Sequence, residues 1–145
     1  MSITIRSVER DHESVHKAVV EALIAFNDAK AGPSGFGPIA FAIEDEHGQT
    51  IGGLSAATAY GWLFVELLFV PESLRGRGIG TDLIRRAESE AIARGCHSVW
   101  LDTFEFQARG FYERLGYTCF GELKHYPTGS RFFMSKPLTR PLEPS

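Results

Sequence analysis

The sequence predicts a mixed α/β (α+β) fold, in which a mostly antiparallel sheet contains two parallel central strands and is flanked by helices. Three observations support this prediction. A chain of 145 residues can bury the core of one compact domain. Its apolar patterns alternate between strand and helix spacing in the order β-α-β-β-β-α-β-α-β-β. A helix separates the strands at residues 63–70 and 98–103, and such a connection makes its two strands parallel.

The beginning of the chain carries one strand pattern and one helix pattern. Apolar residues at positions 3–8 predict a short opening strand. Asp11 is a suitable N-cap for the helix that follows, because apolar side chains recur after it at helical spacing. We expect this helix to end near Asn27 and Asp28, where a loop rich in glycine and proline begins. Capping is the favoured role for these two residues, and contact with a substrate is the alternative.

Three antiparallel strands and a helix come next. Residues 39–44 and 50–58 form a hairpin across the polar EDEHGQ segment, and a tight turn leads into the strand at 63–70. Pro71 closes that strand, since proline cannot donate a hydrogen bond to a ladder. The following helix ends at Gly95 and buries an apolar stripe. Its expected solvent-facing residues are Arg85, Arg86, Glu88 and Glu90.

The end of the chain completes the sheet. The expected elements are a strand at 98–103, a helix within 104–117, and a closing hairpin of strands at 117–124 and 130–137. No linker, repeat or second domain is evident, so the predicted domain spans residues 1–137. The last residues, 138–145, are expected to form a frayed tail.

Composition narrows the class of protein. A formal net charge of −3 and the lack of a basic stripe argue against a nucleic-acid partner. The two cysteines, Cys96 and Cys119, form neither a disulfide framework nor a metal-ligand motif, so no metal is expected. The chain shows no signal-like segment and no apolar run of membrane-spanning length. We therefore expect a cytoplasmic protein with no membrane partner.

A glycine-rich turn joins the strand at 63–70 to the next helix. Gly76, Gly78 and Gly80 alternate with Arg75 and Arg77 at the point where the helix begins. Small residues let the backbone close around a ligand, and the first N–H groups of a helix point outward without partners. Together with the helix dipole they form a site suited to phosphate or pyrophosphate, which arginine also binds well. The alternative is a plain strand-to-helix turn, which also uses glycine.

Two common phosphate-binding motifs do not match this turn. A Walker loop requires a lysine after its glycines, and none is present. In a G-x-G-x-x-G fingerprint that starts at Gly76, the last glycine would fall on Thr81.

The glycine-rich turn does match the motif [Q/R]-x-x-G-x-[G/A] at Arg75, Gly78 and Gly80, after a strand that ends in Phe-Val-Pro. A second motif, A-x-x-F-Y-E-R-x-G-Y, occupies residues 108–117. Together these segments resemble the GNAT family of N-acetyltransferases over nearly the whole chain. The resemblance implies the single-domain GNAT fold, with acetyl-CoA as co-substrate wedged between two splayed central strands. One departure is Glu105, where the family often has asparagine.

The resemblance also implies a set of binding residues. The pantetheine arm would pair with backbone at Leu68, Phe69 and Val70, and the Val70 N–H would polarise the thioester carbonyl. The pyrophosphate would lie on the backbone amides of Arg75, Gly76, Arg77, Gly78, Ile79, Gly80 and Thr81.

Tyr112 matches the family's catalytic tyrosine and would protonate the leaving thiolate, because a phenol is still protonated at neutral pH. Helix pattern alone would favour a half-buried packing residue at this position.

Glu66 is the candidate base on the amine side. It interrupts an apolar strand, and alternation predicts that it shares a face with Phe64, Leu68 and Val70. A carboxylate inside a strand is costly unless it is paired or hydrated, so an acceptor cleft suits it. A surface position with a salt-bridge partner is the alternative, and Asp102 is the second candidate base.

These features predict an acetyl-CoA-dependent N-acetyltransferase, which moves an acetyl group to a primary amine of a small molecule or peptide by direct attack in a ternary complex. Trp62, Tyr60, His125 and Tyr126 are candidates for the acceptor side, or simply packing residues. The alternative function is an acyl-CoA-binding sensor or regulatory module of the same fold without turnover. The identity of the amine and the oligomeric state, including a homodimer, are left open.

Overall fold

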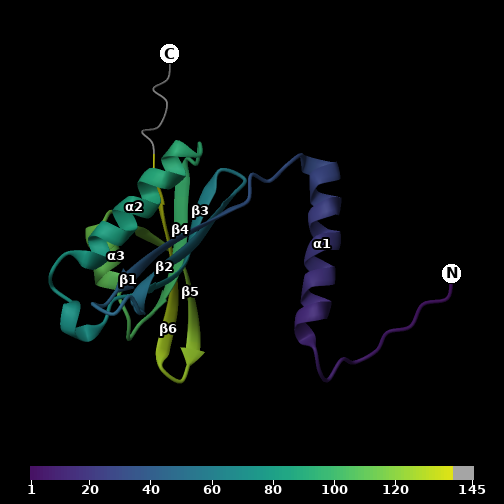
Figure 1. The fold of residues 1–145 in the computed structure, drawn as a ribbon, viewed down its shortest axis with the longest axis horizontal. Coiled ribbons are helices and arrows are strands. Elements are labelled where there is room, and N and C mark those ends of the chain that lie inside the picture. Colours follow the sequence, from purple (N-terminus) through teal and green to yellow (C-terminus); the bar gives the residue numbers. More distant parts are fainter. Residues whose placement is uncertain (139–145) are drawn as a thin grey trace, which may run out of the picture. The chain divides into compact units, whose positions relative to one another are not determined.

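The computed structural model describes residues 1–138 of the chain (Figure 1). These residues form two compact units, Met1–Ser34 and the part that begins at Gly35. The expected tail falls almost entirely on residues 139–145, which lie outside the described residues. No helix among residues 1–138 combines the length and the apolar character needed to cross a membrane.

The first unit contains one long helix, α1 (His12–Ala31). Asp11 caps it as predicted, since its carboxylate accepts hydrogen bonds from the Ser14 amide at 3.3 Å and the Ser14 hydroxyl at 2.7 Å. The predicted end near Asn27 and Asp28 is wrong, because both residues lie within the helix. Good helix-forming residues carry the helix on to Gly32, whose φ of 80° ends it.

The opening strand predicted at residues 3–8 is also wrong, since these residues adopt no regular structure. A strand is stable only when its backbone pairs with a neighbour, and the first unit contains no second strand to supply the ladder. Alternating apolar residues are therefore not sufficient for a strand here.

The second unit is built on a six-stranded sheet with the order β1-β2-β3-β4-β6-β5. All neighbouring strands are antiparallel except β3 and β4, as the sequence predicts. The strands are β1 (Gly37–Glu44), β2 (Thr50–Ala59), β3 (Trp62–Phe69), β4 (Ser98–Phe104), β5 (Thr118–Tyr126) and β6 (Gly129–Pro137).

One face of this sheet is covered by helices. A short 3-10 turn, η1 (Glu72–Leu74), precedes α2 (Ile79–Ala93), and α3 (Arg109–Arg114) follows β4 (Figure 1). Four apolar side chains of α2 join the core with residues of the sheet: Leu83, Ile84, Ala87 and Ala91. The helix α3 lies within the predicted range 104–117 and begins only at Arg109, because the residues after Phe104 form a turn. In that turn the Gln107 amide donates to the Phe104 carbonyl at 2.9 Å, and the Phe104 amide donates to the Gln107 side chain at 2.7 Å.

The two parallel strands separate part of the way along their length. Their pairing runs from Trp62↔Ser98 to Val65↔Leu101 and then stops. Both strands continue, β3 to Phe69 and β4 to Phe104. The expected splay of the central strands is therefore present. Beyond the last rung, the facing backbone edges of β3 and β4 have no strand partner between them.

A β-bulge changes the faces of β3 near this point. The bulge lies opposite Ser55 and Ala56 of β2, which pair with Leu67 and Val65, so Glu66 has no partner in the register. Leu68 pairs with the buried Leu54 and packs on the core. The prediction that Glu66 shares a face with Leu68 and Val70 is therefore wrong, because the bulge inserts one residue and shifts the alternation.

Candidate active site

The first turn of α2 presents unused backbone donors. Its N-cap is Gly78, with a φ of 79°, and no side chain caps the helix. Within the described residues, no acceptor meets the backbone N–H groups of Ile79, Gly80 or Thr81. By contrast, the side chain of Asp11 caps α1. An uncapped helix start with a side-chain-free residue before it leaves room for an anionic ligand.

The two arginines of the turn have different surroundings. Arg75 folds back, and its Nε donates to the Val70 carbonyl at 3.0 Å, which ties the turn to the end of β3. Arg77 is exposed and forms no ion pair or hydrogen bond within residues 1–138. Arg77 is therefore the arginine with its full guanidinium available to an anion, whereas Arg75 also shapes the backbone.

The turn packs directly against two other predicted parts of the site. A Cβ built on Gly80 would lie 3.3 Å from the Phe111 ring and 3.7 Å from the Val70 side chain. Glycine at this position therefore lets the first turn of α2 approach both the end of β3 and α3. This contact brings the glycine turn, the strand end and the tyrosine-bearing helix to one place.

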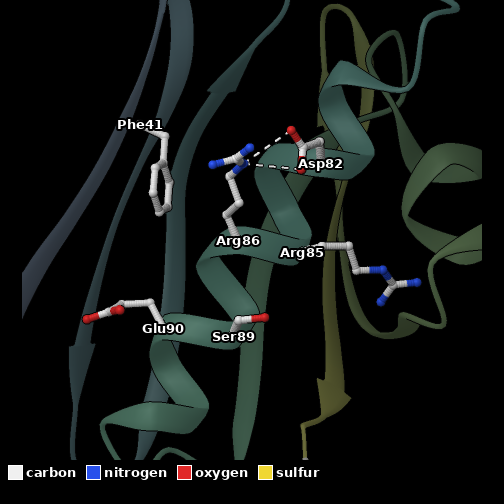
Figure 2. Close-up of a pocket in the computed structure, with 6 residues that line it drawn as sticks. All are labelled: Phe41, Asp82, Arg85, Arg86, Ser89 and Glu90. Atoms are coloured by element: carbon white, nitrogen blue, oxygen red, sulfur yellow. Dashed lines mark hydrogen bonds and ion pairs between the residues drawn. The ribbon is translucent and has the colours of Figure 1, made fainter.

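A hollow lies between α2 and β1, beside the first turn of α2 (Figure 2). Its lining residues are Phe41, Asp82, Arg85, Arg86, Ser89 and Glu90. Arg86 is held by both carboxylate oxygens of Asp82 at 3.2 Å, and Arg85 points away toward Glu88 at 3.0 Å. Because both arginines are paired, this hollow offers little uncompensated charge for a phosphate.

Tyr112 is buried, but its hydroxyl has no partner among residues 1–138. The residue is 6% exposed, and its ring packs edge-on against Phe111 and Tyr117 at centroid distances of 5.1 and 5.7 Å. No hydrogen bond to the hydroxyl is present within the described residues, although every fully buried side-chain oxygen or nitrogen there has a partner. The hydroxyl therefore reaches accessible space, where a ligand could accept its proton.

Burial sets the protonation state of this tyrosine. Desolvation, assisted by the negative charge of Asp102, raises the pKa of Tyr112 from 10.0 to about 12. The phenol is thus fully protonated at neutral pH, as a proton donor must be.

A polar cluster next to Tyr112 was missed by the sequence analysis. Glu88 was expected in solvent but is 5% exposed, and it accepts a hydrogen bond from the Tyr117 hydroxyl at 2.9 Å. Lys136 completes the cluster through an ion pair with Glu88. The available signal was helical spacing, because Glu88 lies four residues after the buried Ile84 and three before the buried Ala91.

The two candidate bases lie on either side of the strand opening. Glu66 and Asp102 are the first residues beyond the last paired rung, Val65↔Leu101. Two residues before them, the rings of Phe64 and Trp100 stack at 4.2 Å, and alternation places Glu66 and Asp102 on that same face. Both carboxylates therefore belong to the same part of the splayed strands.

Their environments differ. Glu66 is exposed and has no ion pair within the described residues. Asp102 is paired with Arg131, whose Nε and Nη2 both lie 2.9 Å from one carboxylate oxygen. The negative charge of Asp102 also adds to the effect of burial in raising the pKa of Tyr112.

Glu105, Trp62 and Tyr126 have local partners. The Glu105 carboxylate accepts from the Ser130 amide at 2.9 Å and so holds the β5–β6 turn. Trp62 packs on His97, and Tyr126 packs on Phe104, at 5.5 and 5.0 Å between ring centroids. Residues 1–138 contain no group of three or more histidine, cysteine or acidic side chains arranged to hold a metal ion.

Comparison with known proteins gives a consistent result. Residues 6–117 match the model of the acetyltransferase (GNAT) family. An acetyltransferase from Agrobacterium fabrum is 42% identical over 113 residues, which cover 78% of this chain and 82% of that protein. Blasticidin-S acetyltransferase from Streptomyces morookaense is 42% identical over 85 residues, which cover 58% of this chain and 62% of that protein.

Solved structures share the fold. A candidate acetyltransferase from Agrobacterium tumefaciens superposes with a TM-score of 0.83 at 38% identity, over 94% of this chain and 99% of that one. An aminoglycoside 6′-N-acetyltransferase in complex with coenzyme A superposes with a TM-score of 0.58 at 26% identity, over 72% of this chain and 75% of that one.

Proposed function

Because the chain belongs to the acetyltransferase (GNAT) family and is an N-acetyltransferase, we propose that acetyl-CoA is its acyl donor and a small cationic amine its acceptor. One observation carries the proposal. The ladder between β3 and β4 stops at Val65↔Leu101, and the uncapped start of α2 packs on the end of β3 through Gly80 and Val70. Unpaired backbone edges and free amides therefore lie together.

The donor is bound at two kinds of backbone group. The pantetheine arm contains amides, and these pair with the free edge of β3 at Leu68, Phe69 and Val70, as an added strand would. The pyrophosphate accepts from the amides at the start of α2, where the helix dipole favours negative charge. Arg77 adds an exposed positive charge at the rim.

Acetyl transfer then proceeds by direct attack. The neutral amine nitrogen forms a bond to the thioester carbonyl carbon while the Val70 N–H stabilises the developing oxyanion. The carbon–sulfur bond breaks as the intermediate collapses, and the Tyr112 hydroxyl donates its proton to the departing sulfur. The nitrogen loses its proton to a base on the amine side. The products are the acetylated amine and free CoA thiol.

The carboxylates beside the strand opening support a cationic acceptor. Glu66 is exposed and free of ion pairs in the described chain, so it can bind an ammonium group and take its proton directly or through water. Asp102 is partly neutralised by Arg131 and is the second candidate. Two similar proteins are named for the molecules that they acetylate, blasticidin S and an aminoglycoside, and these names support a small-molecule acceptor for this chain.

The test is release of free thiol from acetyl-CoA in the presence of single amines. The panel contains blasticidin S, an aminoglycoside, a polyamine, free amino acids and a short peptide with a free N-terminus, with a no-amine reaction as control. Amine-dependent thiol release, with the acetylated product seen by mass spectrometry, supports the proposal. Tight acetyl-CoA binding without release for any amine would instead indicate a sensor or regulatory module.

A further inference from the structure

Lys136 is the centre of a buried polar cluster outside the proposed reaction path. Its ammonium pairs with the Glu88 carboxylate, donates to the Leu115 carbonyl at 3.1 Å, and lies 5.0 Å from the centre of the Tyr117 ring. The Tyr117 hydroxyl donates to the same Glu88 oxygen at 2.9 Å. The side chains of Lys136 and Glu88 are only 14% and 7% exposed.

The cluster joins three elements of the fold. Glu88 lies on α2, Lys136 on β6, and Leu115 and Tyr117 on the turn that follows α3. Burying an ion pair costs desolvation energy that often cancels its Coulombic gain, so stability alone is a weak reason for such a cluster. The cluster does fix the orientation of its side chains, because each hydrogen bond requires a particular arrangement of its donor and acceptor.

The same turn holds Tyr112. The backbone amides of Leu115 and Tyr117 both donate to the Tyr112 carbonyl at 3.0 Å, and the Tyr117 ring packs edge-on against the Tyr112 ring. At the other end of α3, the Thr103 hydroxyl accepts from the Ala108 amide at 3.2 Å. A helix of six residues has few internal bonds, so these outside contacts decide where its tyrosine lies.

We infer that Glu88, Tyr117 and Lys136 act together as positioning residues for the Tyr112 hydroxyl. Because Glu88 is on α2, the cluster also connects α2, whose first turn is the proposed pyrophosphate site, to α3, which carries Tyr112. The inference rests on the proposed role of Tyr112 as the acid. The cluster does not touch the reacting atoms itself, since the Tyr117 hydroxyl is committed to Glu88.

The expected kinetic signature separates positioning from packing. Tyr117→Phe keeps the ring and removes only the hydroxyl that is anchored to Glu88. It should lower kcat roughly 10- to 100-fold while leaving the KM for acetyl-CoA nearly unchanged, because a small displacement of a proton donor slows chemistry without weakening ground-state binding. Ser14→Ala is the control, because it also removes a hydroxyl that donates to a carboxylate, that of Asp11 at the start of α1, and it should leave kcat unchanged.

A second variant protects the test against simple loss of folding. The double substitution Glu88→Met/Lys136→Met replaces the buried pair by apolar side chains and leaves no buried charge unpaired. Arg85 also loses its partner Glu88, but its side chain is 53% exposed and water can solvate it. It should melt within a few degrees of wild type and still show the reduced kcat. Glu113→Gln, which removes an exposed ion pair on α3, is its control and should leave kcat unchanged.

The deciding measurement is a double-mutant cycle with Tyr112→Phe, using acetyl-CoA and the fastest amine of the panel. If the cluster acts through Tyr112, Tyr117→Phe causes no further loss of kcat in the Tyr112→Phe background. Equal losses in both backgrounds, or an unchanged kcat in folded cluster variants, overturn the inference and leave the acid role of Tyr112 intact. Full activity of Tyr112→Phe alone overturns the acid role first and the inference with it.

Discussion

Tyr112 and Tyr117 lie side by side with ring centroids 5.7 Å apart, yet only Tyr117 donates its hydroxyl to another residue of the described chain. Burial raises the pKa of both phenols. The difference lies in their partners, because Glu88 occupies one hydroxyl and the other faces accessible space. This contrast separates the structural tyrosine from the candidate acid.

Replacing Tyr112 by phenylalanine tests the acid role. The ring and its packing remain, so we expect turnover to fall by roughly one to three orders of magnitude with little change in acetyl-CoA affinity. Steady-state kinetics and a binding titration measure the two quantities separately. A stability loss with normal turnover would return Tyr112 to a packing role.

Gly78 offers a clean test of the pyrophosphate site. Gly78→Asp and Gly78→Asn place side chains of nearly equal shape at the uncapped start of α2, and both residue types tolerate a left-handed backbone and favour the N-cap. We expect acetyl-CoA to raise the melting temperature of wild type by mass action. The aspartate variant should lose most of this shift, because its carboxylate repels the phosphates.

The asparagine variant is the control for that experiment, since it occupies the same space without charge and should keep a larger share of the shift. ATP and NAD should produce little change in wild type. Gly80→Asp also blocks the site, but its side chain would press on Phe111, so its effect combines charge with packing. If a folded Gly78→Asp protein binds acetyl-CoA as well as wild type does, the glycine segment is only a turn and not a pyrophosphate site.

The pH dependence of kcat in variants of Glu66 and Asp102 distinguishes which of the two carboxylates acts as the base. Glu66→Gln removes a charge without changing shape, and we expect it to lower kcat and to shift or abolish the acid limb of the kcat profile. Asp102→Asn should act differently, because it also leaves Arg131 without its partner and removes a charge that raises the pKa of Tyr112.

Acetyl-CoA affinity should hardly change in Glu66→Gln, since this residue is proposed to act on the amine side. If the profile of Glu66→Gln matches wild type while Asp102→Asn loses the acid limb, Asp102 becomes the base. An unchanged limb in both variants would indicate attack assisted by water alone.

Alkaline pH should weaken the folded state. The pKa of Tyr112 is about 12 in the folded protein against an ordinary value of 10.0, and that of Tyr117 is raised further by burial and by Glu88. A raised pKa means that the folded state holds the proton longer, so this stability is fully present below pH 10.0 and declines as the pH rises toward 12.

Denaturant unfolding at several pH values from about 8 to about 12 measures this decline. Tyr117→Phe should flatten the slope above pH 10.0, because one of the two buried phenols is gone. A free energy of unfolding that is flat across this interval in wild type would contradict the assignment of raised pKa values.

Local patterns accounted for much of the sheet and for the glycine turn. The residues of β1–β6 form alternating or continuous apolar patterns between turn residues, so the pattern predicts the approximate bounds of these strands. The pattern also identifies Asp11 as an N-cap, because capping involves only atoms of neighbouring residues. The parallel relation of β3 and β4 followed from the helix between them. The alternating residues at positions 3–8 failed as a strand because pairing needs a partner that sequence spacing does not reveal.

The sequence by itself therefore determined the order of the elements from α1 onward, the open start of α2 at Gly78 and the position of Tyr112 on a helix. Only the tertiary structure decided which hydroxyl is free, where the β3–β4 ladder stops, and that Glu88 is buried with Lys136. Each of these depends on contacts between residues far apart in the chain. A periodic pattern reports the average face of one element, whereas a bulge, the end of a ladder or an ion pair is set by the neighbouring element.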